Sequence, residues 1–477
     1  MGEHISRAVF RQEVAAMTTT IGDRAVVLGG SMAGLLAARV LSEKFREVIV
    51  VERDPLPESA TRRRGTPQDR HIHGLAARGQ QVLDELFPGF TRDMQAQGVP
   101  VLDQLADARL YFSGHRLQQG TSGVTIVCAS RPFLEAYVRT RVRALPAVTV
   151  LDCCNSVGLM TTDDRSRVVG ARIFRRADGS TSEELEADLV VDATGRGSRL
   201  PVWLQDLGYE APAEEKTPIR VGYATRIYSL ASSALSPEHA VITAPTPQHP
   251  RGAGLSTLEG GRLLVTLMGI LGDYPPTDPD GFLAFARSLQ FPDVYDVIRD
   301  AEPLEDPVAA RFPASTRHRY ERLHAFPEGL LVTGDAVCSF NPIYGQGMTV
   351  AALDALAIRA HLEKNGRGRP QDYLRRIAKV IDIPWDMAAG GDLAYPGVEG
   401  IRTRKIRMGN AYIPRVAAAA EHNAAVGAAF LRVATMTRRP ETLFSPAVSL
   451  RVLATALRLR TPFPRPMSHR FSSREPM

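Results

Sequence analysis

The residues best suited to chemistry near the start of the chain lie in VVLGGSMAGLLAARVL, residues 26–41. Dinucleotide-binding loops carry the pattern G-x-G-x-x-G, and here Ser31 stands between Gly29 and Gly34 where the middle glycine is expected. Gly29 permits a sharp turn, Gly34 permits close helix–strand approach, and the helix N-terminus offers N–H groups to a diphosphate. The stretch predicts a phosphate-binding loop in which the Ser31 hydroxyl donates to an oxygen.

A carboxylate follows the next predicted strand. The segment EVIVVERD, residues 47–54, reads as an apolar strand that ends at Glu52, 23 residues after Gly29. A carboxylate in this position accepts hydrogen bonds from the ribose of a nucleotide. Two other interpretations of the loop stay open: a glycine turn without a ligand, and the nucleophile elbow of a serine hydrolase with Ala33 in its last position. The elbow is disfavoured because it normally follows several strands, whereas almost nothing precedes this loop.

Two later segments repeat the pattern of an apolar strand followed by a small-residue turn. DLVVDATGRGSRLP, residues 188–201, closes on Thr194 and Gly195. GLLVTGDAVCSFNPIYGQGMTVAALDALAIRAHL, residues 329–362, has a strand that ends at Gly334 and Asp335, then a loop, then a predicted amphipathic helix. A helix N-terminus directs partial positive charge at an anionic or electron-rich group. Asp335 is placed to accept hydrogen bonds from sugar or ribityl hydroxyls.

The three segments GGSMAG, DATG and GDAVCSFNPIYGQGM, in this order, resemble the FAD-binding aromatic-hydroxylase superfamily. These are flavoprotein monooxygenases with the fold of para-hydroxybenzoate hydroxylase, and the resemblance covers residues 22–380. The segments RRRGTPQDRHIHGLAARGQQVLDELFPG and NPIYGQGM are most similar to bacterial epoxidases and hydroxylases of polyketide and terpenoid pathways.

The resemblance implies an FAD-dependent enzyme that transfers one oxygen atom from O2, through a C4a-hydroperoxyflavin, to an apolar secondary metabolite. Olefin epoxidation is favoured over aromatic hydroxylation, in a setting such as antibiotic biosynthesis. The alternative is an FAD-dependent alkene reductase of the geranylgeranyl reductase type. No catalytic side chain is expected, because the flavin carries the chemistry.

The resemblance also implies roles for individual residues. Gly29, Ser31 and Gly34 would bind the diphosphate, Glu52 the adenosine ribose and Asp335 the ribitol. Arg131, at a predicted helix start, would face the cofactor, unless it is a surface arginine. The predicted cofactor-binding residues are Gly29, Ser31, Met32, Ala33, Gly34, Glu52, Arg53, Arg131, Asp335, Pro342, Gly345, Gln346, Gly347 and Met348, of which those from Pro342 onward would form the loop beside the isoalloxazine ring.

The source of electrons is left open by the middle segment. Many relatives carry an Asp-Gly pair there that serves both FAD and NADPH, and this chain has Asp192-Ala193-Thr194-Gly195 instead. NADPH or NADH would therefore reduce the flavin directly or through a separate flavin reductase or ferredoxin-type donor. A halogenase is disfavoured because residues 54–130 contain no lysine and the only tryptophans are Trp203 and Trp385.

The order of the predicted strands and helices that position these residues indicates an α/β fold. It consists of a Rossmann-like FAD-binding domain interleaved with an antiparallel-sheet substrate domain, followed by a C-terminal helical region. Residues 108–117 are expected to form a hairpin of the substrate sheet. The predicted limits are a loose extension (1–20), the FAD-binding domain (21–104, 124–212 and 318–380), the substrate domain (105–123 and 213–317) and the helical region (381–477).

Composition narrows the class of protein. Hydrophobic residues make up 44% and charged residues 23% of the 477 positions, as in ordinary globular proteins. The net charge of +6 comes almost wholly from arginines spread along the chain, without lysine runs, which disfavours nucleic-acid binding. Four cysteines form no disulfide framework, and the N-terminus lacks a signal-peptide core, so a cytoplasmic protein is expected.

Two further features have open interpretations. His71 and His73 in DRHIHGL are expected on different sides of a helix, which disfavours a metal site; with Arg70 they line the flavin pocket or are structural. The last helices carry arginines beside apolar faces, which fits a packed helical tail or a face that contacts a membrane surface or a reductase. No run of 18 apolar residues is present, so at most peripheral membrane contact is expected.

Overall fold

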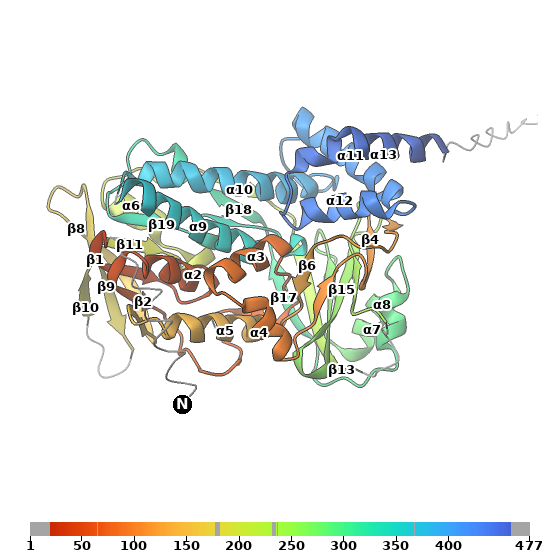
Figure 1. The fold of residues 1–477 in the computed structure, drawn as a ribbon, viewed down its shortest axis with the longest axis horizontal. Helices are drawn as coiled ribbons and strands as arrows, with labels where there is room; N and C mark the ends of the chain where they lie inside the picture. Colours follow the sequence, from red (N-terminus) through yellow and green to blue (C-terminus); the bar gives the residue numbers. More distant parts are fainter. Residues whose placement is uncertain are drawn as a thin grey trace, which may run out of the picture.

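The structure is a computed structural model of the chain. It describes residues 20–63, 65–176, 182–230, 235, 237–366 and 368–458 (Figure 1). The predicted loose extension lies outside the described residues, apart from residue 20.

A five-stranded parallel sheet forms the centre of the part of the molecule that carries the three predicted turns. The strand order is β19 (Leu330–Val332), β11 (Leu189–Asp192), β1 (Gly22–Leu28), β2 (Phe45–Val51) and β7 (Val148–Leu151). The last four residues of β1 and of β2 are apolar and buried, as are β19 and most of β11, because both faces of the sheet are covered there. Since β19, β11 and β1 are parallel neighbours, the turns that follow them lie at one edge of the sheet.

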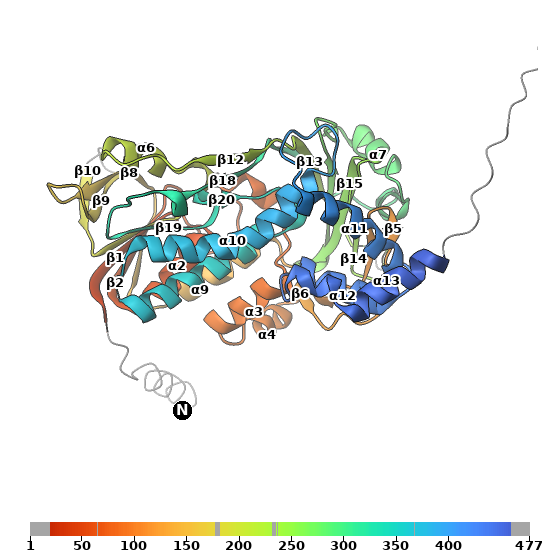
Figure 2. The same ribbon diagram turned by 90° about the horizontal axis from the view of Figure 1, so that it is seen from above.

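Helices cover one face of this sheet and a small antiparallel sheet covers the other (Figure 2). The helices on this side of the molecule are α2 (Met32–Leu41), α3 (Ala77–Leu86), α4 (Phe90–Ala96), α5 (Arg131–Arg143), α9 (Gly347–Asn365) and α10 (Pro370–Asp392). The small sheet is β8 (Cys154–Thr161), β9 (Val168–Arg175) and β10 (Ser182–Glu186), followed after β11 by α6 (Leu200–Asp206). Sequence reasoning did not anticipate this small sheet.

The prediction of an amphipathic α9 was wrong. The helix is enclosed by α2, α3 and α10, so it is buried on nearly all sides. Its alanine-rich sequence explains this, because small side chains let neighbouring helices pack closely. Polar side chains of α9 such as Thr349 and Asp354 are buried as a result.

A seven-stranded sheet forms the second large layer. Its order is β17 (Val308–Phe312), β13 (Val221–Ser229), β16 (Arg262–Gly269), β15 (Arg251–Leu258), β14 (Ala240–Thr243), β4 (Ala108–Phe112) and β5 (His115–Arg116). The predicted hairpin is confirmed as β4 and β5 of this sheet. All pairs are antiparallel except β14 with β4, which is parallel. Helices α7 (Pro279–Arg287) and α8 (Asp293–Ile298) share a hydrophobic core with the sheet.

Two small sheets and the C-terminal helices complete the described chain. The sheets are β12 (Glu214–Thr217) with β18 (Ser315–His318) and β20 (Cys338–Ser339), and β3 (Val101–Asp103) with β6 (Thr125–Val127). The helices are α11 (Arg404–Ala420), α12 (Ala424–Ala434), η7 (Pro440–Phe444) and α13 (Pro446–Arg458). The predicted domain limit at residue 380 falls inside α10. Among the described residues, no helix has both the length and the apolar composition needed to cross a bilayer.

The close contact between the end of β1 and α2 predicts the effect of a substitution at Gly34. A Cβ atom at Gly34 would lie 1.8 Å from the backbone oxygen of Gly29, so Gly34→Ala forces the helix away from the strand. We expect the variant to lose about 1–3 kcal/mol of unfolding free energy, the usual range for overpacking. Urea unfolding followed by circular dichroism measures the loss.

Gly409→Ala is the matched control, because Gly409 also lies in a helix but a Cβ atom there meets open space. It should be neutral or stabilising by about 0.5–1 kcal/mol. Equal stability of the Gly34→Ala variant and the wild type would contradict the described packing.

Candidate functional site

The three glycine-marked turns meet in space. Gly29 has a φ of +105°, and a Cβ atom there would lie 2.4 Å from the backbone oxygen of Ala193 in the second turn. A Cβ atom on Gly334 would lie 2.7 Å from the Cβ of Ala33, which joins the third turn to the first. A Cβ atom on Gly195 would lie 4.0 Å from the Cβ of Asp335. Segments from three distant parts of the chain therefore form one surface.

Buried carboxyl groups hold two of these turns. Asp192 accepts hydrogen bonds from the Thr194 amide at 2.9 Å and the Thr194 hydroxyl at 2.6 Å. Asp354 of α9 accepts from the Gly334 amide at 3.1 Å and the Thr333 hydroxyl at 3.4 Å. Burial raises the pKa of both groups, and it raises that of Asp354 to about 7 although both hydrogen bonds oppose the shift. These groups position the turns from behind.

A buried cluster of charges surrounds Ser31 at the first turn. The Ser31 hydroxyl donates to Glu135 at 3.1 Å and accepts from Arg131 at 3.3 Å and from Arg63 at 3.4 Å. Arg63 and Arg131 both pair with Glu135, and Arg139 lies 3.7 Å from it. Burial acts to raise the pKa of Glu135, but Arg131 and Arg63 outweigh burial and lower it. The carboxylate therefore balances several buried cations.

These residues fit a dinucleotide such as FAD. Ser31 is the residue before α2, so the N–H groups of that helix and the cations of Arg63 and Arg131 lie where a diphosphate would bind. The Glu52 carboxylate is buried and accepts from the amides of Gly30 at 2.7 Å and Asp54 at 3.0 Å. Its second-strand position matches the predicted ribose contact.

Asp335 and the loop after it fit the flavin end of the same cofactor. Asp335 is half-buried; burial raises its pKa, while Arg196 and Arg131 oppose the shift. The loop turns at Gly345, whose φ is +63°, and α9 begins two residues later with its N-terminus at the loop. The Gln346 side-chain oxygen is buried without a hydrogen-bond partner among the described residues. Such an orphaned acceptor is expected where a bound group supplies the donor.

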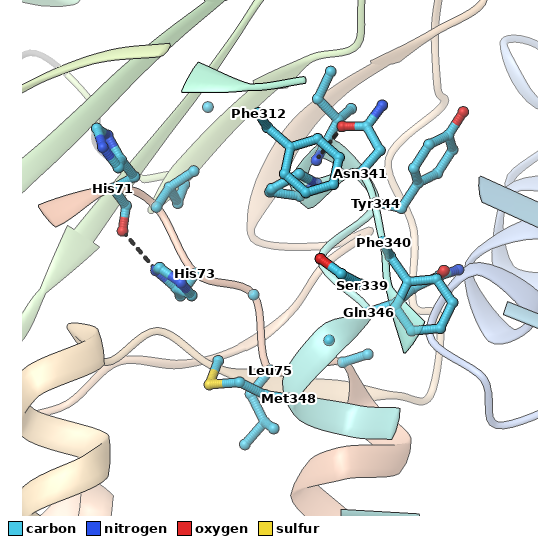
Figure 3. A pocket seen from close by; sticks show the side chains of 18 of the residues that line it. His71, His73, Leu75, Phe312, Ser339, Phe340, Asn341, Tyr344, Gln346 and Met348 are labelled. Carbon is cyan, nitrogen blue, oxygen red and sulfur yellow. Dashed lines mark hydrogen bonds between the residues drawn. The ribbon is translucent and has the colours of Figure 1, made fainter. Parts of the chain in front are cut away.

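One continuous cavity of about 2380 Å³ adjoins all three turns. In Figure 3, His71 and His73 lie on one wall and Ser339, Asn341 and Phe312 on the other. The predicted helix at the two histidines was wrong: the chain is irregular there, and the Nδ1 of His73 lies 2.9 Å from the backbone oxygen of His71. The segment does not coil into a helix because it crosses to the large sheet. There the Nδ1 of His71 lies 2.7 Å from the Thr225 hydroxyl.

Both histidines are neutral near pH 7. Burial, with Arg70 and Arg62 nearby, lowers the pKa of His71 to about 4. Burial and Arg131 lower the pKa of His73 to about 3. The Nε2 atom of His71 is buried without a partner among the described residues. This wall of the cavity therefore carries no positive charge from imidazole.

A second polar cluster lines the cavity beside the Gly345 loop. The Asp392 carboxyl accepts from the Asn341 amide at 2.9 Å and from the Tyr344 hydroxyl at 3.1 Å. The Tyr223 hydroxyl donates to the Asn341 oxygen at 3.4 Å. Burial raises the pKa of Asp392 to about 7, although Asn341 and Tyr344 oppose the shift. Asp392 can therefore take up or release a proton near neutral pH.

The structure brings almost all the predicted site residues together. The cavity is lined by Gly29, Ser31, Met32, Ala33, Glu52, Arg53, Arg131, Asp335, Pro342, Gly345, Gln346, Gly347 and Met348. Gly34 does not line it, because this glycine lies under the turn against Gly29. Direct contact of each residue with FAD stays a prediction.

Sequence reasoning missed Arg63, Glu135, Asp354 and Asp392. The position of Glu135, four residues after Arg131 on one helix, is a signal for an ion pair that could have been used. Asp354 stands out as a charged residue in an alanine-rich helix. Arg63 and Asp392 carry no local signal, because their partners are distant in sequence.

The charge cluster predicts a stability effect that depends on FAD. Glu135→Gln removes the anion that balances Arg63 and Arg131, so the apoprotein should lose about 3–5 kcal/mol of unfolding free energy. The diphosphate of added FAD supplies negative charge, so the loss should be smaller in the holoprotein. Chemical unfolding with and without FAD measures both values.

Glu183→Gln is the control, since its pair with Arg175 lies at the surface with both side chains partly exposed. It should change the unfolding free energy by less than about 1 kcal/mol in either form. An equal effect of the two variants, or a loss at Glu135 that FAD leaves unchanged, would contradict the assigned role.

Two buried carboxyl groups predict the pH dependence of stability. The pKa values of Asp354 and Asp392 are about 7 in the folded protein and near 3.8 in the unfolded chain, so folding favours their protonated forms. Their contribution is complete below pH 3.8 and is lost as the pH rises through 7. The lowered pKa values of His71 and His73 oppose this loss below pH 6.5, so we expect the unfolding free energy of the apoprotein to fall between about pH 6.5 and 8.

Asp354→Asn should flatten this fall, because asparagine keeps an oxygen for the Gly334 amide but does not titrate there. Asp300→Asn, at an exposed position, should leave the slope unchanged. The measurement is urea unfolding at several pH values, and a slope equal in all three proteins would refute the assignment.

Comparison with known proteins identifies the family. The sequence pattern of the family described as FAD binding domain matches residues 24–375. Protein Rv3254 of Mycobacterium tuberculosis is 38% identical over 398 residues, covering 80% of this chain and 82% of that protein. A kynurenine 3-monooxygenase of Salinispora tropica is 28% identical over 354 residues, covering 70% of this chain and 72% of that enzyme.

Solved structures share the fold. The flavin-dependent brominase Bmp2 has a TM-score of 0.63 at 14% identity, covering 91% of this chain and 98% of that one. A mutant of 2-methyl-3-hydroxypyridine-5-carboxylic acid oxygenase has a TM-score of 0.56 at 21% identity, covering 82% and 97%. At these identities the similarity concerns the fold alone. The chain therefore belongs to the FAD binding domain family and has the fold of the aromatic-hydroxylase-type flavoprotein monooxygenases.

Proposed function

We propose that this FAD-dependent monooxygenase inserts one oxygen atom of O2 into a large apolar secondary metabolite, with epoxidation of an olefin as the preferred reaction. The observation that carries the proposal is the size and continuity of the cavity. Its volume of about 2380 Å³ exceeds the ~1,000 Å³ upper range of ordinary small-molecule sites. A cavity of that size has room for a second large molecule beside the cofactor.

The wall formed by the large sheet supports an apolar substrate. Ile72, Ile227, Leu258 and Leu264 form one hydrophobic cluster, and all four line the cavity. The neighbouring histidines are neutral near pH 7. An apolar patch on this wall binds hydrocarbon and excludes water from the reacting atoms. An olefin needs no base for its activation, which agrees with such a wall.

Bound FAD supplies the oxygen chemistry, and the residues of this chain bind and position the reactants. Arg63 and Arg131 would hold the diphosphate, Asp335 would hold ribityl hydroxyls, and the N-terminus of α9 would stabilise negative charge on the ring. Electrons come from NADPH or NADH, directly or through a flavin reductase or ferredoxin-type donor, in the cytoplasm. The DATG segment in place of an Asp-Gly pair supports a separate donor.

A second candidate is hydroxylation of a phenol, and one observation favours it. A phenol reacts faster as its anion, and its deprotonation requires a base. The Asp392 carboxyl, with its pKa near 7 and its hydrogen bond from Tyr344, lines the same cavity. The pair could carry a phenolic proton away from the substrate. The comparisons give the alkene reductase alternative no support.

The test compares metabolites from cells that express the wild type with metabolites from cells that express Asp335→Ala. We expect a product heavier than its precursor by one oxygen atom, present with the wild type and strongly reduced with the variant. The reason is that Asp335 contributes to FAD binding without carrying the fold. Mass spectrometry measures the product, and an equal protein level of both forms is the control.

The outcomes separate the candidates. Opening of the product to a diol in acid identifies an epoxide, whereas an acid-stable product with a new phenolic hydroxyl identifies the second candidate. A product heavier by two hydrogen atoms would overturn both in favour of alkene reduction.

A further inference from the structure

The net positive charge of the chain is concentrated at one end. Residues 1–400 carry 44 Lys and Arg side chains against 49 Asp and Glu side chains. The described C-terminal stretch, residues 401–458, carries ten against two. Arginines occur throughout the sequence, as expected, but only in the C-terminal helices are they not balanced by carboxylates.

The cations of α11 lie mostly unpaired on its outer surface. Arg404, Arg407 and Arg415 are exposed, and the helix contains no acidic residue. Among the described residues, Lys405 is the only cation of α11 with a carboxylate partner, Asp386. This part of the surface therefore attracts anions.

Exposed apolar side chains gather on the same helices. Of ten large hydrophobic side chains that are exposed in the described chain, six lie between residues 401 and 457. Leu450, Leu453 and Leu457 of α13 are 66%, 55% and 57% exposed. Their spacing places them on one side of the helix, opposite the buried Val448 and Val452. The leucine stripe faces away from the protein core.

Helices α11 and α13 contact each other and form the outer edge of the molecule, with α12 beneath them (Figures 1 and 2). We define the C-terminal face as the outer surface of α11, η7 and α13. It combines unpaired arginines with a stripe of leucines. Amphipathic helices that lie in the headgroup region of a bilayer combine the same two features.

The cavity opens at this face. Met408 of α11 and Phe444 of η7 both line the cavity, and they are 67% and 54% exposed. Tyr412 also lines it and stacks on Phe444 with ring centroids 4.7 Å apart. A side chain that both lines the cavity and reaches solvent marks its mouth. One mouth of the cavity therefore lies on α11 and η7, the elements next to α13.

We propose that the C-terminal face docks on the surface of an anionic bilayer, and that an apolar substrate passes from the bilayer through this mouth into the cavity. Acidic headgroups neutralise Arg404, Arg407 and Arg415, while Leu450, Leu453 and Leu457 insert at the headgroup boundary. The access route rests on the proposed function, whereas the docking does not.

Other occupants of the face fit less well. A second copy of this chain would bring two surfaces of the same strong positive charge together, which opposes a symmetric dimer. An acidic protein would complement the arginines, but it offers no general partner for a leucine stripe that projects outward along the whole of α13. A bilayer accepts both kinds of side chain.

The test is co-sedimentation of the FAD-loaded full chain with lipid vesicles. The wild type should bind vesicles of phosphatidylcholine with phosphatidylglycerol and not vesicles of phosphatidylcholine alone. The triple variant Arg404→Gln, Arg407→Gln, Arg415→Gln should bind about a hundredfold more weakly, because each basic side chain near an anionic surface contributes about fivefold. The triple variant Leu450→Ser, Leu453→Ser, Leu457→Ser should lose about tenfold or more.

Matched controls alter similar side chains elsewhere. Val202→Ser with Leu304→Ser changes two other exposed hydrophobic residues, and Arg299→Gln with Arg375→Gln changes two exposed arginines. Both controls should bind like the wild type. FAD content and unfolding temperature establish that each variant is folded.

Failure of the wild type to bind anionic vesicles would overturn the proposal. Loss of binding in the arginine variant with full binding in the leucine variant would overturn the insertion of the leucine stripe, because charge attraction alone would then account for the binding. A dimer that the leucine substitutions dissociate, without vesicle binding, would identify a second copy as the occupant. Since none of these measurements involves turnover, the docking and the proposed reaction fail independently.

Discussion

The close contact of three turns at one edge of a parallel sheet is the constraint on which the rest of the site depends. Strands β19, β11 and β1 are neighbours, so the turns that follow them must share the space beyond their carboxyl ends. That space is so narrow that a methyl group at Gly29 or Gly334 would collide with another turn. The chain meets the constraint with glycine at the contacts and with buried carboxyl groups, Asp192 and Asp354, that fix the turns from behind.

Positive charge at the three turns adds to the constraint set by the backbone. The N-termini of α2 and α9 point at the same cavity, and Arg63 and Arg131 add full positive charges near the first of them. Glu135 balances these cations within the protein, so the cluster can be buried in the folded chain. The cations still attract an anion of higher charge, such as a diphosphate. On the far side of the cavity the histidines are neutral and the sheet is apolar. One cavity thus combines a polar, charged region with an apolar patch on the opposite wall.

The strands and helices that flank the three turns could be derived from the sequence because their signals are local, whereas the small sheet of β8, β9 and β10 was not anticipated. Gly29, Asp335 and Gly345 each lie at a turn between an apolar strand and a helix, and a turn is readable from a few residues. Arg63 and Asp392 could not be derived, because their roles depend on distant partners: Glu135 is 72 positions from Arg63, and Asn341 is 51 positions from Asp392. The predictions of an amphipathic α9 and of a helix at His71 were wrong for a related reason. Tertiary contacts decided both, through the burial of α9 by three helices and through the bond of His71 to the large sheet.

The order of the segments along the chain has a consequence for biosynthesis. The first turn contains Gly29 and the third contains Gly334, with the whole large sheet between them in sequence. A nascent chain leaving the ribosome holds β1 and β2 long before β19 exists to pair with β11. Parallel pairing between such distant segments is slow to form and leaves apolar strand edges open meanwhile. The complete cofactor site can therefore form only after residue 334 has left the ribosome, when most of the chain has been made.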